Sequence, residues 1–159
     1  MEIKLIKFSK KFITKEYIAW LNNKNLNKYS RLSYKKNSKR DVLIYLNLMK
    51  KNLFYAIVLK KNNKHIGNIS AYLDKYNKTA DLSILLAYQK RGYGFAAWKE
   101  IIIKITSMKY RKVTAGAMSI NTPMIKLFKK SGMKFEYKKK KHFIYKNKLI
   151  DLVGYYKFI

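Results

Sequence analysis

The stretch Tyr88-Gln89-Lys90-Arg91-Gly92-Tyr93-Gly94-Phe95-Ala96 connects a strand-like segment to a helix-like one. The apolar run Leu82–Ala87 before it has the length of a buried strand, and Ala97–Ile105 after it has the pattern of a helix. Glycine lets backbone approach a ligand closely, and the first N–H groups of a helix point at anionic oxygens. The stretch therefore predicts a phosphate site at a helix start, although a short glycine motif alone does not identify the ligand.

Length and composition favour one folded domain over residues 1–159. The chain is 48% hydrophobic and 15% aromatic, which argues against disorder. No apolar run reaches the roughly 18–20 residues of a membrane span, and the first twenty residues carry scattered lysines, so we expect a cytoplasmic protein. Cysteine is absent, and His65 and His142 are far apart in sequence, so we predict no disulfide and no metal site. His65 lies beside a predicted turn and is expected on the surface.

The net charge of +29 comes from 37 Lys and Arg against 8 Asp and Glu. Lys, Asn, Ile and Tyr are all abundant, so A/T-rich codon usage explains the lysine excess as well as a functional demand does. Whatever its origin, such a surface attracts anions, repels polycations and destabilises the compact state by self-repulsion.

Periodicity, cap residues and turns predict the order β-α-α-β-β-β-α-β-α-β-β. The predicted strands are Glu2–Phe8, Leu53–Lys60, His65–Leu73, Thr79–Ala87, Lys112–Ser119, Met133–Phe143 and Leu149–Phe158. The predicted helices begin at the caps Thr14, Ser38 and Asn121 and at Gly94, and end near Leu21, Lys51, Gly132 and Ser107. Pro123 is expected at the first helical position. Gly67 predicts a bulge or a close backbone approach, and Lys138–Lys141 is expected on a solvated face or loop.

This order, with the glycine turn between the fourth strand and the third helix, resembles the GNAT superfamily of acetyl-CoA-dependent N-acetyltransferases over nearly the whole chain. Gln89–Gly94 fits every fixed position of the family motif Q/R-x-x-G-x-G/A. Asn121 and Gly132-Met133 resemble the family's helix-opening asparagine and its Gly-Phe pair, with Met in place of Phe. Tyr17–Asn22, followed by Tyr29-Ser30-Arg31, resembles the ribosomal-protein-acetyltransferase-like branch, which includes amino-sugar acetyltransferases.

The resemblance implies a single-domain α/β (α+β) fold, with a mixed, mostly antiparallel seven-stranded sheet flanked by about four helices. It also implies acetyl-CoA as co-substrate. The backbone of residues 91–96 would hold the pyrophosphate, Lys99 or Lys130 would help to neutralise it, and the pantetheine arm would lie between the splayed ends of the fourth and fifth strands. The cofactor-binding residues implied are Ile84, Leu85, Leu86, Gln89, Lys90, Arg91, Gly92, Tyr93, Gly94, Phe95, Ala96, Asn121 and Phe128.

The implied chemistry is direct attack of a neutral amine on the thioester, with a backbone N–H of the fourth strand stabilising the oxyanion. Asp81 resembles the family's base and would act through water, with Ser83 as relay; the alternative is a strand-edge carboxylate paired with a lysine. Phe128 stands where many relatives carry a tyrosine that protonates the thiolate. Either another tyrosine (Tyr88, Tyr93 or Tyr137) replaces it or the thiolate leaves unaided.

The acceptor is expected to be an anionic small-molecule amine, such as a nucleotide-linked amino sugar in surface-polysaccharide synthesis, because the charge repels cationic amines. Candidate acceptor-binding residues are Trp20, Tyr29, Arg31 and Tyr72, with a core position for Trp20 and a solvated position for Arg31 as alternatives. A protein N-terminus is the second acceptor class. The sequence is also compatible with a basic nucleic-acid-binding module, with a GNAT fold that binds coenzyme A without catalysis, and with a homodimer.

Overall fold

The computed structural model describes residues 2–88 and 92–159. Within them one mixed sheet has the strand order β1-β2-β3-β4-β5-β7-β6. The strands are β1 (Ile3–Lys7), β2 (Leu53–Leu59), β3 (His65–Asp74), β4 (Thr79–Leu86), β5 (Lys112–Met118), β6 (Lys134–Tyr145) and β7 (Lys148–Phe158). The helices are α1 (Lys15–Asn22), α2 (Lys39–Leu48), α3 (Tyr93–Ser107) and α4 (Thr122–Lys130), with short 3-10 turns η1 (Lys10–Phe12), η2 (Arg31–Tyr34) and η3 (Met49–Lys51). The predicted element order is confirmed.

All neighbouring strands are antiparallel except β4 and β5, which run parallel. The predicted meander of β2, β3 and β4 is therefore present, and β6 and β7 form the predicted C-terminal hairpin. None of the helices in residues 2–88 and 92–159 is long and apolar enough to cross a membrane.

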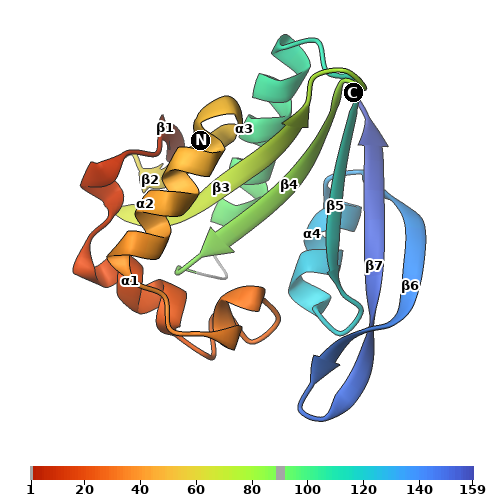
Figure 1. Cartoon of the computed structure of the whole chain (residues 1–159). Coiled ribbons are helices and arrows are strands. Elements are labelled where there is room, and N and C mark those ends of the chain that lie inside the picture. Colours follow the sequence, from red (N-terminus) through yellow and green to blue (C-terminus); the bar gives the residue numbers. More distant parts are fainter. Residues whose placement is uncertain (1, 89–91) are drawn as a thin grey trace.

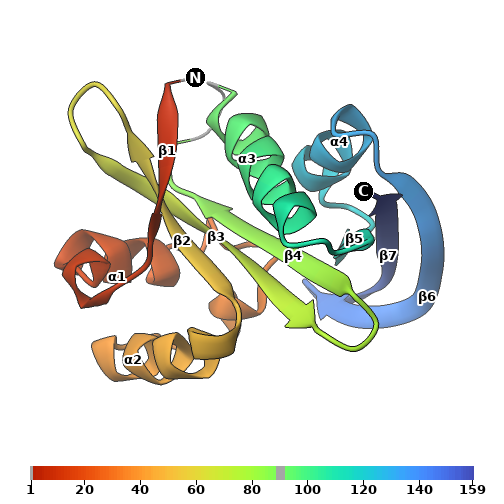
Figure 2. The same ribbon diagram turned by 90° about the horizontal axis from the view of Figure 1, so that it is seen from above.

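Helices cover both faces of the sheet. Helices α3 and α4 lie on one face, and α1 and α2 lie on the other, toward the β1 edge (Figure 1, Figure 2). The larger core lies under α3 and α4 and is centred on the fully buried Trp98, Ile101 and Phe128. The smaller core lies under α1 and α2 and contains Phe8 and Phe54, whose rings stack with centroids 4.2 Å apart. The sheet is thus the middle layer of three.

Local signals place the helix starts as predicted. The side-chain oxygens of Thr14 and Asn121 accept the N–H groups of Tyr17 and Met124, and Ser38 forms a reciprocal capping box with Asp41. Gly132 follows α4 at φ +77°, a conformation that favours glycine. One detail differs: α4 begins at Thr122, so Pro123 occupies its second position. A proline is tolerated there because the N–H groups of the first turn have no partner within the helix.

Gly67 has both features expected of it. The register of β2 against β3 shifts beside it, between Ile57 and Val58. A side chain at Gly67 would place its Cβ 2.3 Å from the carbonyl oxygen of Leu85 on β4, so only glycine fits this approach of two strands.

His65 is not on the surface, and that expectation was wrong. It is half-buried, because aromatic side chains of η1 and α1 pack around its imidazole. The ring centroids of Phe12, Tyr17 and Trp20 lie 5.0, 5.5 and 5.1 Å from that of His65. The run Lys138–Lys141 is exposed as expected, and it lies in the edge strand β6, where the register shifts after Lys139.

Candidate functional site

The parallel strands β4 and β5 stay together over a short distance only. Their pairing comprises the three rungs Thr79–Lys112, Ala80–Val113 and Asp81–Thr114. Beyond these rungs β4 continues to Leu86 and β5 to Met118 without pairing, so the two strands diverge (Figure 1). The splay predicted for these strands is therefore present.

The polar groups of the β4 main chain alternate between its two neighbours. The Ala87 N–H donates to the Ile66 carbonyl, so this antiparallel pair is hydrogen-bonded and every second residue of β4 also faces β3. Leu85 belongs to that set. Ile84 and Leu86 belong to the other set, and their N–H and C=O groups point into the splay, where the described residues provide no paired strand. An extended ligand chain can therefore pair with Ile84 and Leu86.

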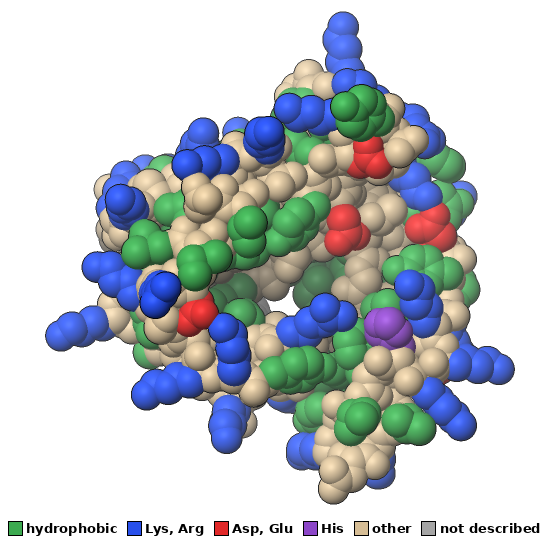
Figure 3. All heavy atoms as spheres, in the orientation of Figure 1, with side chains coloured by type: hydrophobic (Ala, Val, Ile, Leu, Met, Phe, Trp, Pro, Cys, Tyr) green, Lys and Arg blue, Asp and Glu red, His purple; other side chains and the backbone are tan. Residues whose placement is uncertain are grey.

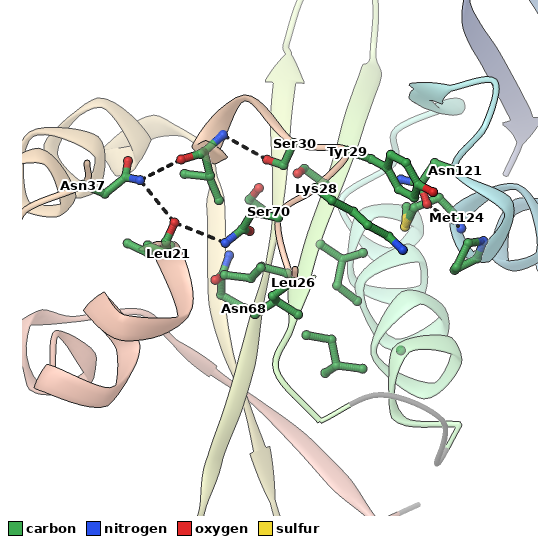
Figure 4. Close-up of a pocket in the computed structure, with 18 of the residues that line it drawn as sticks. Leu21, Leu26, Lys28, Tyr29, Ser30, Asn37, Asn68, Ser70, Asn121 and Met124 are labelled. Carbon is green, nitrogen blue, oxygen red and sulfur yellow. Dashed lines mark hydrogen bonds between the residues drawn. The ribbon is translucent and has the colours of Figure 1, made fainter. Parts of the chain in front are cut away.

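A cavity of about 820 Å³ lies beside the splayed end of β4, against Ser83–Leu86 and the start of α4, within the usual volume range for ligand sites (Figure 3, Figure 4). Its walls come from α1 and the loop after it, from α2, β3 and β4, and from the N-terminal parts of α3 and α4. Its polar lining residues include Tyr17, Asn27, Lys28, Tyr29, Asn37, Asp41, Tyr45, Asn68, Ser70, Ser83 and Asn121. Among the described lining residues only Lys28 and Asp41 carry charge. Lys35 and Ser38 hydrogen-bond to Asp41 and hold its carboxyl pKa well below the usual range.

The start of α3 has the geometry of an anion site. Gly92 has φ +76° and precedes the helix, and the helix itself offers no partner to the N–H groups of Tyr93, Gly94 and Phe95. The Ala96 N–H, by contrast, donates to the Gly92 carbonyl at 3.1 Å and forms the first hydrogen bond of the helix. It is therefore not available to bind phosphate, contrary to the prediction for residues 91–96. Gly94 also lines the cavity. The predicted Gln89, Lys90 and Arg91 lie outside the described residues.

Two predicted phosphate-neutralising lysines meet at this helix start. The Nζ atoms of Lys99 and Lys130 lie 5.9 and 4.6 Å from the centroid of the Phe95 ring. Lys99 comes from the second turn of α3 and Lys130 from the end of α4, so their convergence depends on the packing of the two helices. Positive charge and N–H groups that have no partner within the helix therefore occur together at the first turn of α3.

Asp81 sits at the apex of the splay. The Thr114 hydroxyl donates to its Oδ1 at 2.7 Å. The side chain is exposed to solvent, yet desolvation by neighbouring atoms raises the pKa of the Asp81 carboxyl, and the bond from Thr114 opposes the rise. Ser83, two residues on and on the same face, lines the cavity, whereas Asp81 does not. With about 3.3 Å of rise per residue, the two lie about 7 Å apart along the strand, a distance that requires a water relay.

Phe128 is fully buried in the core, and its ring contacts those of Trp98 and Tyr155 with centroids 5.7 and 5.2 Å away. It does not line the cavity. Of the tyrosines considered as replacements, Tyr93 has its side chain in the core, and Tyr88 lies under the Lys64 ammonium beside a separate hollow. Burial raises the pKa of Tyr137, and so does the charge of Asp81.

The four predicted acceptor residues do not come together. Tyr29 lines the cavity. Trp20 is half-buried, packs against Tyr17 and His65, and lines the separate hollow instead. Arg31 and Tyr72 are exposed, and neither lines the cavity, although Tyr72 pairs with Asp81 across β3 and β4.

Sequence reasoning missed the floor of the cavity. Asn68 and Ser70 on β3 line it, and the Tyr17 hydroxyl donates to Asn68 Oδ1 at 3.1 Å. Tyr45 of α2 lines it too, and burial raises its pKa, so it stays protonated. The signal that was overlooked is a pair of polar residues, Asn68 and Ser70, at alternate positions of an otherwise apolar strand.

Comparisons with known proteins agree with this geometry. Residues 10–134 match the family model of the acetyltransferase (GNAT) domain. No curated protein sequence matches the chain.

Solved acetyltransferases share the fold. The spermidine N-acetyltransferase of Vibrio cholerae, in complex with CoA and spermine, superposes with a TM-score of 0.86 at 14% identity, over 99% of this chain and 95% of that one. The microcin C7 self-immunity acetyltransferase MccE, in complex with acetyl-CoA and AMP, gives 0.84 at 22%, over 99% and 93%. The ribosomal-protein-alanine N-acetyltransferase of Brucella melitensis gives 0.81 at 16%, over all of both chains.

Proposed function

The chain belongs to the GNAT family of acetyltransferases and uses acetyl-CoA, and we propose that it transfers the acetyl group to a primary amine on an anionic small molecule, such as a nucleotide-linked amino sugar in surface-polysaccharide synthesis. The observation that carries the proposal is the charge of the cavity. Its described lining holds one cation, Lys28, and one acid, Asp41, which is already paired with Lys35. A polyamine would find no free carboxylate there, and the +29 chain would repel it.

We place acetyl-CoA with its phosphates at the start of α3 and its pantetheine arm along the splayed end of β4. The pyrophosphate of acetyl-CoA lies at the N–H groups of Tyr93, Gly94 and Phe95, with Lys99 and Lys130 beside it. The pantetheine arm then pairs with the exposed main chain of Ile84 and Leu86, as an added strand would. Asn121, which lines the same cavity, contacts the pantetheine or thioester region.

Transfer then proceeds by direct attack. Asp81 accepts the amine proton through water and Ser83, which connects the apex to the cavity. A β4 N–H stabilises the oxyanion, and Ile84 is suitably placed because its main chain points into the splay. The bond from the carbonyl carbon to sulfur then breaks and the thiolate leaves. Phe128 has no hydroxyl to protonate it, and a coenzyme A thiol needs little assistance near neutral pH.

An acceptor screen tests the function. Thiol release from acetyl-CoA should occur with nucleotide-linked amino sugars and amino-sugar phosphates, and should be slower with spermidine and with peptides bearing a free N-terminus. A preference for spermidine would contradict the anionic class. A preference for peptides would favour N-terminal acetylation, the activity named for the Brucella neighbour of the same fold.

A binding measurement separates acetyl transfer from nucleic-acid binding and from coenzyme A binding without catalysis. Acetyl-CoA at about 100 times its Kd should stabilise the fold by about 2.7 kcal/mol and raise the melting temperature accordingly. An unchanged melting temperature together with salt-sensitive RNA or DNA binding would instead support a nucleic-acid-binding module. Stabilisation without turnover of any amine would support a non-catalytic coenzyme A-binding protein.

A further inference from the structure

Two tyrosines from distant parts of the sequence meet at the cavity. Tyr29 follows α1 and lines the cavity, and Tyr145 ends β6, next to the tip of the C-terminal hairpin. Their ring centroids lie 5.5 Å apart at an interplanar angle of 52°. Both residues are half-buried, so part of each ring remains accessible to a ligand.

A lysine accompanies each ring. The Lys28 Nζ lies 5.0 Å from the Tyr29 ring centroid, and the Lys146 Nζ lies 5.7 Å from that of Tyr145. Both lysines are exposed, and neither is in an ion pair with the acids of the described chain. Lys28 also lines the cavity, where it extends across the space near Tyr29 (Figure 4). We call these four residues the tyrosine–lysine cluster.

The backbone holds the cluster in place on both sides. Asn27 is 1% exposed, and its side-chain amide donates to the carbonyls of Trp20, Leu21 and Asn23. It therefore fixes the loop two residues before Tyr29. On the other side, Lys146 and Asn147 have φ +47° and +58°, as in a two-residue hairpin turn, and Tyr145 pairs with Lys148 across it. Both rings are thus positioned before a ligand arrives.

We propose that the tyrosine–lysine cluster is the subsite for the nucleotide part of the acceptor, in which Tyr29 and Tyr145 stack the base and Lys28 and Lys146 bind its phosphates. An aromatic face supplies stacking to any base, and an exposed ammonium supplies a mobile charge for phosphate. A base between two rings needs centroids about 7 Å apart, so at 5.5 Å it stacks on an accessible ring face rather than between them. The inference rests on the proposed function and specifies its acceptor.

The geometry also explains why the subsite belongs to the acceptor and not to coenzyme A. The predicted phosphate site at Tyr93–Phe95 lies at the start of α3, whereas the cluster is built from the loop after α1 and the tip of the C-terminal hairpin. A nucleotide bound at the cluster should therefore bind equally well to protein already saturated with coenzyme A.

The binding test uses protein saturated with coenzyme A and calorimetric titration with uridine or adenosine monophosphate, compared with ribose 5-phosphate. Stacking should make the nucleotides bind about 5- to 100-fold more tightly than ribose 5-phosphate. Tyr145→Ala should remove most of that difference, while Tyr145→Phe, which keeps the ring, should retain it. Lys28→Gln should weaken all three ligands alike. Tyr76→Ala, at a fully exposed turn residue between β3 and β4, is the matched control and should change nothing.

Equal binding of nucleotides and ribose 5-phosphate, or an unchanged difference in a folded Tyr145→Ala variant, would overturn the subsite. The melting temperature of each variant shows whether it has folded. The proposed function has a separate readout, thiol release with a nucleotide-linked amino sugar and with the matching amino-sugar 1-phosphate. Transfer to both acceptors at equal KM would support the proposed function and contradict the subsite. Preferential binding of nucleotides without transfer to any acceptor would support the subsite and contradict the proposed function.

Discussion

The Thr114 hydroxyl donates a 2.7 Å hydrogen bond to the Asp81 carboxylate on the last rung that joins β4 and β5. Beyond this rung β4 diverges from β5 and its residues Ser83–Leu86 line the cavity. The bond crosses between the two strands at the last of their three paired rungs, so it fixes the proposed base where the strands begin to diverge. Because it stabilises the ionised form, it lowers the pKa of Asp81 against the opposing effect of desolvation.

Replacement of Asp81 tests the base. Asp81→Asn should lower kcat/KM at pH 7 by about 10²- to 10⁴-fold, the usual contribution of a general base, and by much less at pH 9, where more of the amine is already neutral. A pH series of initial rates measures this difference. Equal losses at both pH values would remove Asp81 from the base role.

Thr114→Val tests the hydrogen bond separately. The valine keeps the shape of the side chain and removes the donor, so the pKa of Asp81 should rise further above its ordinary value. The acidic limb of the kcat/KM profile, which marks protonation of the base, should shift to higher pH while the plateau changes little. A limb that stays in place would show that Thr114 does not act on the titrating group.

The two glycines of the α3 turn should respond differently to alanine. Gly92 has φ +76°, so Gly92→Ala should cost about 1–2 kcal/mol of stability, and about 2–4 °C of melting temperature for each kcal/mol. At Gly94 a Cβ would lie 3.5 Å from Leu86 Cδ2, an ordinary contact, so the fold should tolerate alanine. The family motif also accepts alanine at this position, so KM for acetyl-CoA should change little. Melting curves and acetyl-CoA titrations of both variants measure this contrast, and an equal loss of stability in the two variants would show that the φ of Gly92 does not decide it.

His65 should make the fold sensitive to mild acid. Burial among aromatic rings lowers its pKa below the ordinary value of about 6.5, outweighing the Gly67 carbonyl and Glu16, which favour the charged form. The unfolded chain then binds the proton more tightly than the folded one, so stability falls as the pH drops through about 6.5 toward the folded pKa. Melting curves between pH 8 and pH 5 should show this loss, and His65→Phe should reduce it. His142→Phe, at an exposed position on β6, is the control and should leave the pH dependence as it is.

Salt should stabilise the protein. The described residues contain three ion pairs, all on exposed or half-exposed groups, against a net charge of +29. Added salt shortens the range of the repulsion, and each kcal/mol so gained should raise the melting temperature by about 2–4 °C. Scans at about 0.05 and 0.5 M NaCl measure the effect. A melting temperature that stays level or falls would show that self-repulsion does not limit stability.

The sequence determined the local features of this protein. A helix cap acts within a few residues, as at Thr14, Ser38 and Asn121, and the glycine turn needs only Gly92 and the helix that follows it. Strand and helix periodicity also depends on near neighbours, so the element order could be predicted from the sequence alone. The resemblance to the GNAT superfamily added the mixed seven-stranded sheet and the co-substrate.

Only the tertiary structure decided which residues share the site, because strand register and the packing of distant loops do not leave a local pattern. The register of β4 against β5 joins Asp81 to Thr114, and the fold of η1 and α1 buries His65. The packing of α4 seals Phe128 in the core, away from the cavity its position had suggested. Tyr29 and Tyr145 meet although more than a hundred residues separate them in the sequence, because the hairpin returns to the loop after α1.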